Sequence, residues 1–146
     1  MDNTKLPVIA ITSGDPNGIG YEIILKAMAE PHICEICTPI IYGNLQVAKK
    51  HLQTLDESLH SMQFNLIDSA DKAKVGKVNI INCYPDNIPI KTGVSTAEAG
   101  KAALLALERA TNDMKRKQVN ALLTAPINKE NIQSERFRYS GHTEYL

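Results

Sequence analysis

The sequence predicts an α/β fold in which a mostly parallel sheet is covered by helices on both sides. Short apolar runs alternate with segments of helical periodicity, and several runs are apolar at nearly every position. Continuous apolar runs are typical of strands that are buried on both faces. Alternation of such strands with helices favours parallel pairing, so we expect α/β/α layers.

The first half of the chain contains two strand–helix units. Residues 7–12 and 39–42 are the apolar runs that predict the first two strands, and residues 21–30 between them have helical spacing. Asn44 follows the second strand and is a candidate N-cap. The helix after it would bury Leu45, Ala48, Leu52 and Leu55.

The second half contains three more strands and the most clearly marked helix. Residues 64–67 and 78–82 predict two strands, and residues 120–124 predict another buried strand that ends before Pro126. Ser95 and Glu98 match a capping box, in which Ser95 accepts from the Glu98 amide and Glu98 reaches back. This helix should extend to about residue 117 with these residues on one face: Ala97, Gly100, Leu104, Leu107 and Met114.

Composition limits the classes of function. The 146 residues include 16 basic and 16 acidic side chains, so no long-range attraction to nucleic acid or an anionic membrane is expected. No apolar run is long enough to span a membrane, and the first residues lack a signal-peptide pattern. The three cysteines suggest reduced thiols. We therefore expect a cytoplasmic protein with neither nucleic-acid nor membrane partners.

Two loops that follow strands are candidate ligand sites, because ligands of open parallel sheets bind beyond the carboxyl ends of strands. The loop from Gly14 to Gly20 opens a helix, and its amides could bind an anion, although its spacing is neither a Walker A nor a dinucleotide motif. Asp15 could orient a ligand or close an Asx turn over Asn17. The second loop offers Asn128 and Lys129, where Lys129 could bind phosphate or be solvated surface.

A third polar cluster stands near the end of the sequence. His142 and Thr143 could donate hydrogen bonds to a phosphate or hydroxyl oxygen. Alternatively, Thr143 caps a helix and His142 is exposed. The Cys34-x-x-Cys37 spacing fits redox or zinc chemistry, but no second pair accompanies it and the segment reads as the approach to a strand. Cys83 is interpreted as packing, and the other histidines are assigned no chemistry.

Four motifs together resemble the 4-hydroxythreonine-4-phosphate dehydrogenase family. They are Ile11-Thr-Ser-Gly-Asp-Pro-Asn-Gly-Ile-Gly-Tyr-Glu22, Ser95-Thr-Ala-Glu-Ala-Gly-Lys-Ala102, Thr124-Ala-Pro-Ile-Asn-Lys129 and Ser140-Gly-His-Thr-Glu144. They come in the family's order. The resemblance implies a fold like isocitrate and isopropylmalate dehydrogenases, with residues 1–146 as the N-terminal portion of a longer two-domain protein.

The resemblance also implies an activity. Members of the family use NAD and a divalent metal (Zn, Mg or Co) to oxidise 4-phosphooxy-L-threonine, which then loses CO₂ to give 3-amino-2-oxopropyl phosphate in vitamin B6 biosynthesis. They are homodimers that share residues across the interface. A divalent metal would lower the pKa of the substrate hydroxyl, and NAD would accept the hydride.

The resemblance assigns site residues by position. His142 and Thr143 match the family's substrate-contacting pair, while Gly14, Asp15 and Lys129 lie in motifs assigned to the cleft. The family's three metal-binding histidines lie downstream of these motifs, so we expect no metal site within this chain and no turnover by it alone. Three alternatives remain open: a paralogue acting on 4-phospho-D-threonate or D-erythronate 4-phosphate, a non-catalytic phosphate-binding or dimerisation module, and, more remotely, a phosphotransacetylase-like acyltransferase.

Overall fold

A computed structural model describes residues 5–133 and Tyr145 of the chain. Five strands form a single sheet in the order β3-β4-β2-β1-β5, and every neighbouring pair is parallel. This confirms the predicted α/β class. The strands are β1 (Val8–Thr12), β2 (Thr38–Gly43), β3 (Asn65–Ile67), β4 (Asn79–Asn82) and β5 (Ala121–Thr124).

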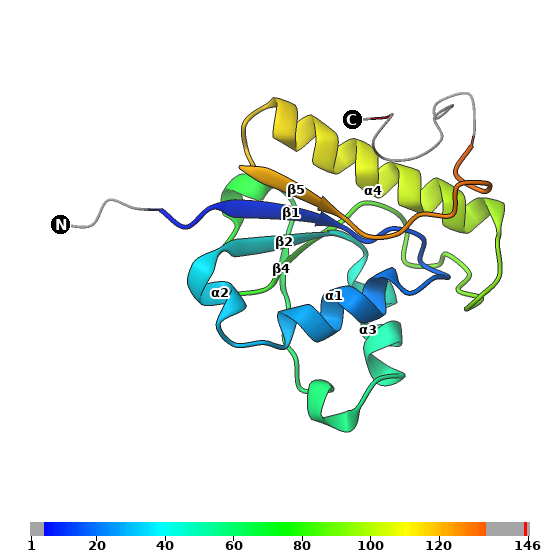
Figure 1. Cartoon of the computed structure of the whole chain (residues 1–146), viewed down its shortest axis with the longest axis horizontal. Helices are drawn as coiled ribbons and strands as arrows, with labels where there is room; N and C mark the ends of the chain where they lie inside the picture. The colour runs from blue at the N-terminus through cyan, green and yellow to red at the C-terminus, as the bar shows by residue number, and fades with distance from the viewer. Residues whose placement is uncertain (1–4, 134–144, 146) are drawn as a thin grey trace.

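Helices cover both faces of the sheet (Figure 1). α1 (Gly20–Met28) and α3 (Leu45–Gln53) contact each other on one side, and the long α4 (Ala97–Lys115) crosses the other side over β2, β1 and β5. The short helix α2 (Ile33–Ile36) precedes β2, and two 3₁₀ turns, η1 (Glu57–Leu59) and η2 (Ala70–Lys72), flank β3. The main core lies on both faces of β2 and β4, where Ile40, Ile41 and Ile80 are fully buried.

The strand order creates a switch point between β1 and β5. β1 continues into α1 on one face of the sheet, whereas β5 is reached from α4 on the other face. Because β1 and β5 pair in parallel from Ile9↔Ala121 to Thr12↔Thr124, the loops that follow them begin side by side. A ligand is expected at such a position in an open α/β sheet.

The capping predictions had different outcomes. Asn44 caps α3 as predicted, since its side chain accepts from the Val47 amide at 3.1 Å. The capping box at Ser95 is wrong, because the N-cap of α4 is Thr96, whose hydroxyl accepts from the Ala99 amide at 3.1 Å. Thr96 is extended, with φ −130° and ψ 154°, so the helix begins one residue later than predicted.

The predicted face of α4 was only partly right. Gly100, Leu104 and Leu107 are buried, but Ala97 and Met114 are exposed. The buried face is built mainly from alanines, which allow the helix to lie close to the sheet. The helix ends at Lys115 rather than near residue 117, because Lys117 has a left-handed φ of 60° that cannot continue it.

One other expectation needs correction, and another was incomplete. The strand at residues 120–124 was expected to be buried, but β5 is an edge strand and Leu123 is 58% exposed. The segment of Cys34 and Cys37 does lead into β2, but the sequence did not predict the short helix α2 that Ile33–Ile36 form within it. In the part of the chain that the structure describes, no helix is long and apolar enough to cross a membrane.

Candidate functional site

The two loops predicted as ligand sites are joined to each other. The Asp15 amide donates to the Pro126 carbonyl at 3.0 Å, so the loop after β1 touches the loop after β5 directly. Gly14 has a φ of +69°, and a Cβ at this position would clash with the same carbonyl oxygen. Only glycine combines the left-handed conformation with this approach, so Gly14 is placed at the junction of the two loops.

Asp15 is buried at this junction, with 6% of its surface exposed. Its Oδ1 accepts from the Asn17 amide at 2.8 Å, which is the Asx turn considered from the sequence. Its Oδ2 accepts from Nδ2 of Asn131 at 3.0 Å and thereby reaches the second loop. The carboxylate therefore holds both loops together. A carboxylate can accept further hydrogen bonds, so contact between Asp15 and a ligand stays a prediction.

The second loop is folded on itself. Oδ1 of Asn128 accepts from the amides of Glu130 and Asn131 at 3.0 and 3.1 Å, so this side chain shapes the turn. Lys129 is exposed, and its carbonyl accepts from the Gln133 side chain at 3.0 Å. Lys129 does not line the cavity described next. Its predicted role at a ligand is neither supported nor contradicted.

A cavity of about 370 Å³ lies at the junction. Its lining comes from three segments that are distant in the sequence: residues 15–19, residues 93–95 before α4, and residues 126–128 after β5. A neighbouring cavity of about 470 Å³ shares Asn17, Gly18, Ile19 and Gly93 with it and extends toward α3. Both volumes are in the range of small-molecule sites.

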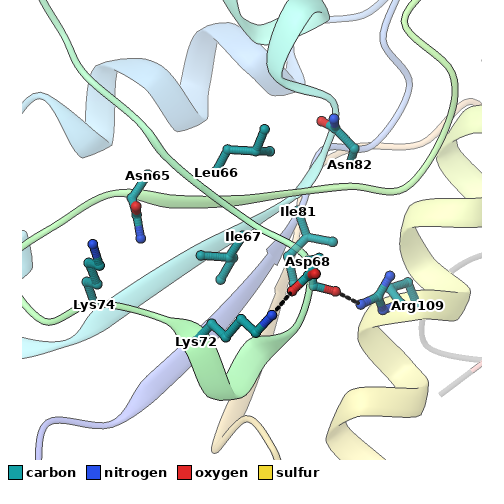
Figure 2. Close-up of a pocket in the computed structure, with 9 residues that line it drawn as sticks. All are labelled: Asn65, Leu66, Ile67, Asp68, Lys72, Lys74, Ile81, Asn82 and Arg109. Atoms are coloured by element: carbon teal, nitrogen blue, oxygen red, sulfur yellow. Dashed lines mark hydrogen bonds and ion pairs between the residues drawn. The ribbon is translucent and has the colours of Figure 1, made fainter.

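A larger hollow of about 810 Å³ lies elsewhere, between β3, β4 and α4 (Figure 2). Two of its cationic side chains bind Asp68: Lys72 pairs with the Asp68 carboxylate at 2.9 Å, and Arg109 donates to the Asp68 carbonyl at 2.7 Å. It is remote from the β1–β5 switch point. We therefore place the candidate site at the smaller cavity beside Asp15.

His142 and Thr143, the predicted substrate-contacting pair, lie outside the described residues. Tyr145, two positions after Thr143, packs against a cluster of buried residues on α4 and after β5: Ala103, Leu104, Leu107 and Ile132. The backbone of Asn131 also packs directly against Gly100 of α4, where a Cβ would clash with the Asn131 carbonyl. The described contacts thus bring residues 127–132 and Tyr145 to α4.

Several buried polar residues behind the site were not identified from the sequence. The Tyr21 and Tyr84 hydroxyls are hydrogen-bonded to each other, and Tyr21 also accepts from the Asn44 amide at 3.0 Å. Burial raises the pKa of Tyr21 to about 12 and that of Tyr84 well above its usual value, so both remain protonated near neutral pH. They act as a hydrogen-bonding scaffold beneath the loop after β1. Tyrosines in apolar surroundings read as ordinary core residues, so the sequence carried no signal for this pair.

His51 of α3 is also part of this support. Its ring stacks on Tyr21 with centroids 4.9 Å apart, and its Nε2 lies 2.7 Å from the Pro16 carbonyl. A carbonyl only accepts, so Nε2 carries the proton. Burial lowers the pKa of His51, which favours the neutral ring near neutral pH. No chemistry was expected of His51 from the sequence, and its contacts in the structure support the loop after β1.

The cysteines belong to no metal-binding group among the described residues. Cys34, Cys37 and Cys83 are free thiols. Burial, and then the neighbouring Cys34, raise the pKa of Cys37, which disfavours its thiolate. Within residues 5–133 and Tyr145, no three His, Cys, Asp or Glu side chains are arranged to hold a metal ion.

The family model of the pyridoxal phosphate biosynthetic protein PdxA matches residues 35–146. The chain belongs to the PdxA family. Over 146 residues it is 44% identical to the 4-hydroxythreonine-4-phosphate dehydrogenase of Bacteroides thetaiotaomicron, which it covers to 39%. It is 36% identical over 149 residues to a putative D-threonate 4-phosphate dehydrogenase of Clostridium botulinum, which it covers to 43%. In both alignments the whole chain is matched, so this PdxA-family chain spans about two fifths of the length of these relatives.

Solved structures agree with the PdxA assignment. The crystal structure of a 4-hydroxythreonine-4-phosphate dehydrogenase from Klebsiella pneumoniae matches 98% of this chain, with a TM-score of 0.83 and 32% identity, and is itself covered to 43%. A terephthalate 1,2-cis-dihydrodiol dehydrogenase from Burkholderia xenovorans has a TM-score of 0.67 at 23% identity over 92% of the chain and is covered to 38%. The second likeness supports the α/β fold alone.

Proposed function

We propose that this chain is part of an NAD- and divalent-metal-dependent dehydrogenase that oxidises 4-phosphooxy-L-threonine to a β-keto acid, whose decarboxylation gives 3-amino-2-oxopropyl phosphate. The observation that carries the proposal is PdxA-family membership together with 44% identity to a 4-hydroxythreonine-4-phosphate dehydrogenase. We also propose that the active protein is a cytoplasmic homodimer.

The geometry supports a small-molecule site at the β1–β5 switch point. Gly14 and Asp15 lie where the two loops meet, beside a cavity of about 370 Å³. The exposed Ser95, which lies just before the N-cap of α4, borders that cavity, and main-chain amides at a helix start suit an anionic group. In the proposal, this chain binds and orients the phosphorylated substrate, and His142 and Thr143 contact it.

NAD and the divalent metal are proposed as cofactors of the whole enzyme of which this chain is a part. NAD would take the hydride from the substrate carbon, and a metal would lower the pKa of the hydroxyl that is oxidised. The described residues do not provide a metal site. The roles proposed for the residues of this chain are substrate binding and orientation.

A second candidate substrate is 4-phospho-D-threonate. It is favoured by the relatives at 36% identity, whose names carry D-threonate 4-phosphate. Both substrates carry the phosphate and a C3 hydroxyl, and their functional groups differ at C2, which bears an amine in the first and a hydroxyl in the second. Residues that bind phosphate would therefore serve both. D-erythronate 4-phosphate, a further relative of these compounds, is tested in the same assay.

The experiment is the intact mass of the purified gene product that contains residues 1–146, paired with NAD reduction on each phosphorylated acid in the presence of a divalent metal. Turnover on 4-phosphooxy-L-threonine with a kcat/KM above that on the other acids supports the first proposal. Preference for D-threonate 4-phosphate supports the second candidate. No NAD reduction on any of them, with metal bound, would favour a non-catalytic binding module and reject both.

The predicted role of His142 has its own test in the same protein. If His142 donates to the substrate, His142→Ala should reduce kcat/KM by roughly tenfold or more while the bound metal content is unchanged. Unchanged kinetics would remove His142 from the site. Loss of metal together with activity would give it a role other than the one proposed.

A further inference from the structure

Residues 91–96, which precede α4, form one wall of the candidate cavity. Residues Lys91 to Ser95 are all exposed and belong to no helix or strand. Gly93, Val94 and Ser95 nevertheless line the 370 Å³ cavity, and Thr92 and Gly93 line the 470 Å³ cavity beside it. An exposed segment without regular structure needs specific contacts to stay in one place.

Asn17 supplies such contacts with both ends of its side-chain amide. Its Nδ2 donates to the Val94 carbonyl at 2.9 Å and to the Thr96 hydroxyl at 3.2 Å. Its Oδ1 accepts from the Lys91 amide at 2.8 Å. Asn17 is only 2% exposed, so these hydrogen bonds are shielded from water. They form between residues 74 to 79 positions apart in the chain.

The main chain of Asn17 continues the connection in two directions. Its carbonyl accepts from the Gly93 amide at 2.7 Å. Its amide donates to Oδ1 of Asp15 at 2.8 Å, and Asp15 in turn holds Asn131 of the loop after β5. One residue thus links the wall at residues 91–96 to the junction of the two loops.

We propose that Asn17 is a positioning residue for substrate binding, which fixes residues 91–96 and the start of α4 against the loop after β1. The inference rests on the proposed function. Asn17 acts through the wall and does not need to touch the reacting atoms. Because Asn17 and Gly93 line both cavities, loss of their connection would open the partition between them.

Asn79 provides a matched control within the chain. It is also fully buried, and its Nδ2 donates to the carbonyls of Pro39, Lys74 and Lys77 at 3.0 to 3.1 Å. Asn79 is at the start of β4, at the opposite end of the strands from the cavity. Asn79→Ala therefore removes a comparable set of hydrogen bonds without touching the wall.

The first test is amide hydrogen exchange in the intact gene product. In Asn17→Ala, protection of the Lys91 amide should fall by roughly tenfold or more, because its acceptor is removed. Asn17→Asp keeps an acceptor for Lys91 but has no donor for Val94 and Thr96, so protection at Lys91 should largely persist. Asn79→Ala should leave it unchanged. Equal loss at Lys91 in the Asn17→Ala and Asn79→Ala variants, or no loss in either, would overturn the connection.

The second test is steady-state kinetics on the phosphorylated acid that the wild-type protein uses. Asn17→Ala and Asn17→Asp should raise KM by roughly tenfold with kcat changed by less than about threefold, whereas Asn79→Ala should change neither. An unchanged KM in the Asn17 variants, or the same rise in Asn79→Ala, would overturn the positioning role. A wild-type protein that turns over none of the acids would overturn the proposed function and the substrate role with it, while the exchange data separately decide whether Asn17 holds the wall.

Discussion

Two buried asparagines hold loops at opposite ends of the sheet, and they differ in how far their partners lie along the chain. Asn79 mainly closes a local turn, because its bonds to Lys74 and Lys77 span only five and two residues. Its longest bond, to the Pro39 carbonyl on β2, spans 40 residues. The side chain of Asn17 instead reaches across 74 to 79 residues to the segment before α4. The amino end of β4 is therefore organised largely by nearby sequence, whereas the side-chain bonds of Asn17 at the candidate site are all long-range.

The glycines of the two regions provide the strongest test of this difference. Gly14 and Gly76 both have positive φ, at +69° and +78°, but Gly14 abuts the Pro126 carbonyl and Gly76 has open space around it. Gly14→Ala combines backbone strain with a clash against distant backbone, so it should cost about 3 kcal/mol or more. Gly76→Ala should cost only the left-handed strain, about 1 to 2 kcal/mol.

Urea unfolding of both glycine variants measures these costs as differences in the free energy of unfolding. A Gly14→Ala variant as stable as Gly76→Ala would mean that the two loops separate easily. In that case the junction beside Asp15 would not be the rigid part of the site.

Substitution of either asparagine should lower the free energy of unfolding by a similar amount, whereas only substitution of Asn17 should affect substrate binding. Asn17→Ala and Asn79→Ala each leave buried donors and acceptors without partners, so each should lower the free energy of unfolding by about 2 kcal/mol. Chemical denaturation with a common slope checks this. A loss in Asn79→Ala alone would indicate that the long-range bonds of Asn17 contribute little, and the contrast between the two regions would be reversed.

A smaller difference in stability is expected between Thr96→Ala and Ser95→Ala. Thr96→Ala removes the N-cap of α4, which also accepts from Asn17, and should cost about 1 kcal/mol. Ser95→Ala removes an exposed side chain and should change stability by less than about 0.5 kcal/mol. Thermal unfolding of the two variants distinguishes them, and the opposite order would restore the capping box that the sequence suggested.

The smallest expected effect is a pH dependence at His51, which supports the loop after β1. Burial lowers its pKa in the folded state below the ordinary 6.5, while its contacts with Pro16 and Glu22 oppose the shift. The unfolded chain therefore binds more protons at this position as the pH falls below about 6.5, and stability is lost there. Above that pH the ring is neutral in both the folded and the unfolded state, so it does not make the free energy of unfolding depend on pH.

His51→Gln lacks this titration but keeps an amide that can donate to Pro16. The difference in unfolding midpoint between the wild-type protein and His51→Gln should therefore become smaller from pH 7.5 to pH 5.5, as wild type alone loses the His51 contribution. Glu22 and Lys50 line the same cavity and are present in both proteins, so the comparison isolates the ring of His51. Parallel midpoints over this range would mean that His51 is not held neutral.

Local features were the ones predicted most accurately. The five strands and the Asn44 cap were found because apolar runs and capping residues act within a few positions of the chain. The error at Ser95 has the same cause, since Ser95 and Thr96 are both good caps and local chemistry does not choose between them. Thr96 is bonded to Asn17, 79 residues away, a contact that no local pattern contains.

The sequence by itself determined the α/β class, the positions of the strands and of the longer helices, and the family motifs with Gly14 and Asp15, because periodicity and turn chemistry are properties of neighbouring residues. Only the tertiary structure decided that β5 lies at an edge beside β1 and that Asp15 bridges to Asn131. It also decided that Asn17 fixes the wall before α4. These contacts depend on strand order, which brings segments 70 or more residues apart into hydrogen-bonding distance. Strand order produces no periodic pattern of residues from which it could be predicted.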